Sequence, residues 1–125
     1  MRYLFCGDRN WQSPYWIWRR IQQLPEGSVV IEGEQKGADR LSRIYAEARG
    51  LEVEKYEAQW EIGPVAGPLR NTKMLDEGKP DVVIAFHNDI AKSKGTKDCI
   101  RRALERNIPV ILCDGGGNST RIKKL

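Results

Sequence analysis

The chain has 125 residues, a length that fits one domain. Hydrophobic residues make up 40% and charged residues 30% of it, which excludes a disordered chain, and no apolar run approaches the ~20 residues that a membrane-spanning helix needs. The formal net charge of +4 comes from 21 Lys and Arg against 17 Asp and Glu. This mild excess suits an anionic small ligand or weak contact with nucleic acid.

The first part of the chain alternates strand and helix patterns. The apolar run at residues 2–6 ends at a glycine and predicts a central parallel strand. Ser13-Pro14 is typical of a helix start, with Ser13 as N-cap and Pro14 in the first turn, and residues 25–27 end that helix. Residues 28–31 predict the second strand, and Ala38-Asp39 leads into a helix that stops at Gly50.

The remaining pattern repeats this alternation. Residues 51–56 alternate apolar and polar side chains, which predicts an edge strand, and a loop at 59–68 leads to a helix at 69–77. The expected later elements are a buried strand at 81–86, a helix at 95–106, a strand at 109–113 and a flexible basic tail at 118–125. The β-α order predicts a single Rossmann-like α/β domain spanning residues 1–125, with a parallel five-stranded sheet and helices on both faces.

The three cysteines, Cys6, Cys99 and Cys113, indicate a reducing compartment. Their number is odd, no CxxC motif occurs and no signal peptide is recognisable, so we expect a cytoplasmic protein without a disulfide framework. His87 is the only histidine. With scattered cysteines and one histidine, we expect no metal site, and no motif predicts a resident cofactor.

Three loops at one end of the expected sheet combine glycine with polar residues near a helix start: residues 7–9, 32–39 and 92–96. Glycine lets a backbone approach a ligand closely, and a helix N-terminus presents free N–H groups to an anion. Arg9, Lys36 and Lys94 add positive charge that suits phosphate. Each loop taken alone is equally compatible with a simple turn.

Several side chains near this end have two readings. Arg70 and Asn71, after Gly67-Pro68, are expected to point toward this end of the sheet, where Arg70 either binds a phosphate or carboxylate or forms an ion pair that supports the long loop. His87 is either an acid or base, or a hydrogen-bonded loop residue. Trp11 and Trp60 either stack on a base or pack on the core.

The chain resembles the YspA-like branch of the SLOG superfamily, Rossmann-like domains related to the LOG and DprA proteins. The segments that carry the resemblance are residues 3–11, 31–39, 66–75, 81–86 and 95–98. The resemblance implies a site for a nucleotide or nucleotide derivative of the AMP or ADP-ribose type, and a homodimer. Together with the loop patterns, it gives the expected ligand-binding set: Gly7, Asp8, Arg9, Trp11, Gly33, Lys36, Gly37, Asp39, Arg70, Asn71, His87, Gly95 and Thr96.

Two departures from the family pattern concern catalysis. Glu34 and Gln35 stand where small residues are usual in the second loop, and Cys99 stands where LOG phosphoribohydrolases carry a glutamate. A carboxylate for N-glycosidic hydrolysis would then come from Asp98, Glu34 or Glu32. We therefore consider a nucleotide-derivative binding or sensing module first, an N-glycosidase acting on nucleoside monophosphates second, and a nucleic-acid-binding protein third, with no membrane partner.

Overall fold

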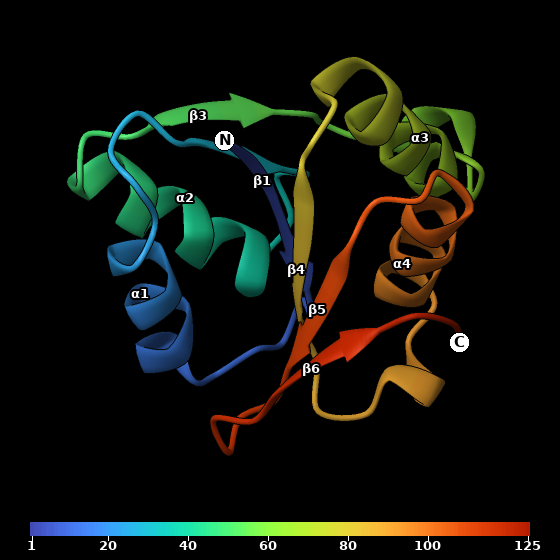
Figure 1. Cartoon of the computed structure of the whole chain (residues 1–125). Coiled ribbons are helices and arrows are strands. Elements are labelled where there is room, and N and C mark those ends of the chain that lie inside the picture. Colours follow the sequence, from blue (N-terminus) through green and yellow to red (C-terminus); the bar gives the residue numbers. More distant parts are fainter.

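The computed structural model describes residues 1–125 and contains one sheet with helices on both sides (Figure 1). The strands are β1 Arg2–Gly7, β2 Val29–Glu32, β3 Glu52–Lys55, β4 Val82–Phe86, β5 Val110–Cys113 and β6 Ser119–Ile122. The α-helices are α1 Pro14–Gln22, α2 Ala38–Ala48, α3 Ala66–Gly78 and α4 Gly95–Glu105, with short 3-10 turns η1 Trp60–Ile62 and η2 Ile90–Lys92. None of these helices combines the length and the apolar character that a bilayer crossing requires.

The strand order confirms the expected Rossmann-like α/β fold. The sheet runs β3-β2-β1-β4-β5-β6, and every neighbouring pair is parallel except β5 and β6. Strands β1 and β4 lie side by side at the centre, with Tyr3 opposite Val82 and Gly7 opposite Phe86. The chain runs outward from β1 toward β3 and outward from β4 toward β6, so the strand order switches between β1 and β4. A crevice at the carboxyl ends of these two strands is where such sheets place ligands.

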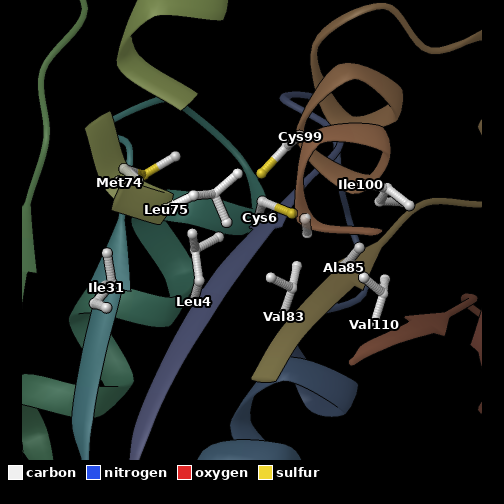
Figure 2. Packing of buried hydrophobic residues seen from close by; sticks show 11 residues of the cluster. Leu4, Cys6, Ile31, Met74, Leu75, Val83, Ala85, Cys99, Ile100 and Val110 are labelled. Carbon is white, nitrogen blue, oxygen red and sulfur yellow. The ribbon is translucent and has the colours of Figure 1, made fainter. Parts of the chain in front are cut away.

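Two apolar cores lie on opposite faces of this sheet. Leu4 and Cys6 of β1 point into the cluster beneath α3 and α4, shown in Figure 2, whereas Phe5 points into the cluster beneath α1 and α2. Successive residues of a strand face opposite sides, so a strand buried on both sides needs apolar residues at every position. This explains the unbroken apolar runs of β1 and β4.

The sixth strand corrects the expectation of a five-stranded sheet and a flexible tail at 118–125. Residues Ser119–Ile122 pair antiparallel with β5, and Cys113 lies opposite Ser119. The Asp114 carboxylate holds the connecting turn by accepting backbone N–H groups of Gly116 at 2.9 Å and Asn118 at 3.0 Å. These hydrogen bonds order a segment whose charge and polarity suggested a solvated terminus.

Helix α3 begins at Ala66, one turn before the expected start at Leu69. Pro68 fits inside the first turn because the first N–H groups of a helix have no partner within the helix. Arg70 and Asn71 therefore lie in the second turn, where both are buried.

Candidate functional site

An open cleft of about 340 Å³ lies at the carboxyl ends of β1 and β4. Its walls are residues 7–10 after β1, residues 92–96 at the start of α4, and the side chains of Gln35, Trp60 and His87. Six residues of these walls belong to the ligand-binding set expected from the sequence: Gly7, Asp8, Arg9, His87, Gly95 and Thr96. The loops after β1 and β4 thus meet around one space, as the strand order requires.

A small inner cavity of about 20 Å³ adjoins this cleft, and Gly7, Gln35, Gly95 and Thr96 line both. Its other walls include three expected residues, Asp39, Arg70 and Asn71. A cavity of this size holds about one water molecule. The inner cavity therefore extends the cleft by no more than one small polar group.

Two glycines allow the loops after β1 and β2 to touch. A Cβ atom on Gly7 would lie 2.3 Å from the carbonyl oxygen of Phe86, and one on Gly37 would lie 2.4 Å from the carbonyl oxygen of Asp8. Gly37 also has φ +72°, a left-handed conformation that favours glycine. The Ala38 N–H then donates to the Asp8 carbonyl at 3.2 Å. Gly7 and Gly37 are thus required by backbone packing, whether or not a ligand binds.

Arg70 and Asn71 brace the site from within. Arg70 Nη1 donates to the Gly33 carbonyl at 2.5 Å, and its Nε donates to Asn71 Oδ1 at 3.0 Å. Asn71 Nδ2 donates to Asp98 Oδ2 at 3.0 Å and to the Gly95 carbonyl at 3.3 Å. This chain of hydrogen bonds ties the loop after β2 to the start of α4. Both side chains line the inner cavity. Gly33 packs against Arg70 and lines neither the inner cavity nor the cleft.

None of the three carboxylates considered for hydrolysis, Asp98, Glu34 and Glu32, lines the cleft or the inner cavity. Asp98 is 8% exposed and accepts hydrogen bonds from Arg102 at 2.9 Å, Arg101 at 3.0 Å and Asn71. Burial acts to raise its pKa, but the hydrogen bonds from Arg102, Asn71 and Arg101 outweigh it, so the pKa of Asp98 lies below its usual value. Glu34 is exposed, and its N–H donates to Glu32 Oε1 at 2.9 Å.

Three further expectations have clear structural outcomes. Trp11 belongs to the core rather than the cleft: it is 5% exposed, packs edge-on against Phe86 with ring centroids 5.6 Å apart, and donates from Nε1 to the Ser13 carbonyl. Lys36 is exposed and lines neither cavity. His87 lines the cleft and accepts the Asp89 N–H at Nδ1, 2.9 Å away.

Two buried carboxyl groups, Glu32 and Asp39, lie near each other at the loop after β2, and the sequence did not predict this pairing. Glu32 is fully buried, and burial together with the neighbouring Asp39 raises its pKa to about 7. Burial also raises the pKa of Asp39 to about 6, although Arg70 opposes this shift. Oε2 of Glu32 has no hydrogen-bond partner. The burial of Glu32 could have been predicted from the period of two along β2, because Glu32 lies on the same face of the strand as the buried Val30.

Cys6 and Cys99 both line the inner cavity. Their side chains lie next to each other in the cluster drawn in Figure 2. The pKa of the Cys6 thiol is raised well above its usual value, mainly by a hydrogen bond with Cys99 and also by burial. Cys6 is therefore a protonated thiol at neutral pH rather than a nucleophile. No group of three His, Cys, Asp or Glu side chains is placed to hold a metal ion.

Comparison with known proteins agrees with the resemblance noted in the sequence. The profile of the YspA, cpYpsA-related SLOG family matches residues 1–63, which include the loops after β1 and β2. Gene 61 protein of Mycobacterium phage D29 is 35% identical over 120 residues, covering 88% of this chain and 94% of the phage protein.

Among solved structures, the chain is similar to Can2 from Sulfobacillus thermosulfidooxidans in complex with cyclic tetra-adenylate. The match has a TM-score of 0.48 and 18% sequence identity, and it covers 97% of this chain. This chain corresponds to 37% of the Can2 chain. From the family profile and the phage relative, the chain belongs to the YspA, cpYpsA-related SLOG family.

Proposed function

We propose that the cleft between the loops after β1 and β4 binds a nucleotide or nucleotide derivative through its phosphate. The observation that carries the proposal is the meeting of three features around one space: positive side chains, a helix N-terminus and an exposed indole. The cleft occupies the point where strand order switches, the usual ligand position in open parallel sheets.

The charge of the cleft favours an anion. Arg9, Lys92 and Lys94 line it, against one acidic side chain, Asp8. Arg9 and Lys94 form no ion pair, and Lys92 pairs only with Asp89 at 3.6 Å, with the lysine side chain 85% exposed. An exposed ion pair of this kind contributes little, so these cations remain free to complement a phosphate.

The start of α4 adds a backbone donor to the same wall. Ser93 Oγ accepts the N–H groups of Thr96 at 3.1 Å and Lys97 at 3.2 Å, so the donor left for an anionic oxygen is the N–H of Gly95, the first residue of the helix. Gly95 opens directly onto this region, because a Cβ atom placed on it would meet nothing within 4 Å. Unlike Gly7 and Gly37, this glycine leaves space that the protein does not fill.

Trp60 provides an aromatic face for a base. Its side chain lines the cleft although the residue is 55% exposed. Gly67 of α3 lies beneath the ring: a Cβ atom there would be 3.3 Å from Cη2 of the indole. An exposed indole beside a cationic wall suits base stacking next to phosphate binding.

The test is a binding measurement with matched charge variants. AMP, ADP-ribose and cyclic tetra-adenylate are screened by thermal shift, because a ligand that binds only the folded protein raises its apparent stability. Affinity for the best ligand is then measured by calorimetry in Lys94→Gln and Lys36→Gln. We expect Lys94→Gln to weaken binding about tenfold and Lys36→Gln to leave it nearly unchanged. Equal effects, or no stabilising ligand, would contradict the proposal.

A further inference from the structure

A second cavity, of about 300 Å³, lies between α1 and the β5–β6 hairpin. It shares no lining residue with the cleft described above. Trp16 of α1, Phe86 at the end of β4 and Cys113 at the end of β5 form its apolar walls. The remaining walls carry two adjacent arginines, Arg19 and Arg20, with Ser119 of β6 opposite them. Its volume is at the lower end of the range typical of small-molecule sites.

The two arginines have no carboxylate partner. Arg20 Nη2 donates to Ser119 Oγ at 2.9 Å and to Cys113 Sγ at 3.6 Å, both neutral groups that hold the guanidinium at the cavity wall. Arg19 lies over the Trp16 ring, with Cζ 5.9 Å from the ring centroid. Neither guanidinium takes part in an ion pair, so two positive charges face one space in which Asp114 is the one acidic side chain.

Asp114, the one acidic side chain in the cavity wall, already accepts hydrogen bonds within its own turn. Asp114 accepts the backbone N–H of Asn118 and of Gly116, and its Oδ2 accepts Asn118 Nδ2 at 3.1 Å. Backbone and side-chain hydrogen bonds from Asn118 lower the pKa of Asp114, so it stays ionised as part of the turn. The hydrogen-bond donors of Arg19 and Arg20 therefore lack an acceptor within the protein that matches their charge.

We propose that this cavity is a second anion site, in which Arg19 and Arg20 hold the phosphate of an organic phosphate ester and the half-buried Trp16 ring contacts its organic part. Planar guanidinium groups suit phosphate because they donate two parallel hydrogen bonds to it. The bond from Arg20 to Ser119 orients one guanidinium before a ligand arrives, so β6 contributes to the site. The phosphate belongs either to a free nucleotide or to a single-stranded nucleic acid.

The test uses tryptophan indole N–H resonances as separate reporters of the two sites. Trp16 Nε1 donates to the Gly115 carbonyl at 3.0 Å beside the second cavity, whereas Trp60 lines the cleft. Titration with AMP, and separately with a short oligothymidylate, is followed by ¹H–¹⁵N spectra, with the Trp16 signal assigned from Trp16→Phe. We expect a saturable shift of the Trp16 resonance with at least one of these probes, and the responding probe identifies the source of the phosphate.

The variants make the outcome specific. The double variant Arg19→Gln/Arg20→Gln should weaken the Trp16 response at least about tenfold, while Arg40→Gln, which removes one exposed positive charge from α2, should preserve it. Arg20→Lys keeps the charge but loses the paired donors, so its Trp16 response should lie between those of the double variant and Arg40→Gln. A Trp16 resonance that moves with neither probe, or that moves equally in the double variant, overturns the proposal. A shift of Trp60 without Trp16 overturns only this second site, and a shift of Trp16 without Trp60 counts against only the cleft.

Discussion

Arg70 occupies the space that a side chain at Gly33 would need, and it hydrogen-bonds to the Gly33 carbonyl at 2.5 Å. A Cβ atom on Gly33 would lie 2.6 Å from Arg70 Nη1 and 2.9 Å from Cζ. Arg70 is 8% exposed and is also bonded to Asn71, so it has little room to move. The glycine at position 33 is therefore part of the brace that joins the loop after β2 to α3.

Gly33→Ala is expected to lower the free energy of unfolding by about 1–3 kcal/mol, because the methyl group displaces a buried guanidinium. Urea unfolding measures the change. Gly95→Ala is the matched control: its Cβ atom meets nothing within 4 Å, so stability should stay the same or rise slightly. A Gly33→Ala protein as stable as Gly95→Ala would contradict the claim that Arg70 packs tightly against Gly33.

Glu32→Gln is expected to stabilise the protein at neutral and alkaline pH. The pKa of Glu32 is raised from 4.5 to about 7, so between these pH values the folded protein keeps a proton that the unfolded chain releases. The free energy of unfolding therefore falls as pH rises through this window. Removing the carboxyl group should recover about 1–3 kcal/mol at pH 8, and little near pH 4.5.

Urea unfolding at the two pH values checks this prediction. Glu26→Gln, in the exposed turn after α1, is the control and should change the stability little at either pH. An identical loss of stability with rising pH in wild type and Glu32→Gln would show that Glu32 is not the group responsible.

Asp98→Asn is expected to act mainly on stability. It removes the negative partner of Arg101 and Arg102 and disturbs the bond to Asn71, at a cost of about 1–3 kcal/mol. Since the pKa of Asp98 is lowered in the folded state, its contribution is present above its ordinary pKa and is lost as pH falls through the folded value. The variant should therefore lose less stability than wild type on acidification.

Asp76→Asn is the comparison for that variant, because it breaks an exposed ion pair between Asp76 of α3 and Arg106, the residue that follows α4. Its effect on unfolding should be clearly smaller. A stable Asp98→Asn protein with ligand affinity intact but a hydrolytic activity lost would instead place Asp98 in catalysis.

Deleting residues 118–125 is expected to destabilise the protein, because it removes β6 and exposes the edge of β5 to solvent and to other chains. Thermal unfolding and light scattering would show a lower melting temperature and self-association. Deleting only residues 123–125 leaves β6 intact and should change neither. A full deletion that behaves like the short one would mean that β6 adds no stability.

The sequence predicted the elements that face the core and missed those held by polar contacts. Apolar runs and glycine breaks were enough for β1 to β5, the four helices and the position of the cleft. β6 was missed because residues 119–121 are polar and exposed, although a glycine-rich turn between two β-prone runs is itself a hairpin signal. The hairpin has a second consequence, since Ser119 positions Arg20 in the second cavity.

Among the site residues, those in local turn patterns were predicted, and the roles of those with distant partners were not. The glycine-rich loops identified the walls of the cleft, because turn chemistry is local. The roles of Arg70 and Asp98 depend on partners 37 and 27 residues away, Gly33 and Asn71, which no local pattern reveals. The sequence placed Trp11 and Trp60 alike in loops, and the packing of Phe86 against Trp11 separates the core residue from the cleft residue.

The central claim, that the cleft at the ends of β1 and β4 binds a phosphate-bearing nucleotide, is tested most directly by titrating ¹⁵N-labelled protein with ADP-ribose. We predict saturable shifts of the backbone amides of Gly7, Gly95 and Thr96 and of the Trp60 indole, all of which line the cleft. Unchanged resonances at all four positions, or shifts confined to residues outside the cleft, would contradict it.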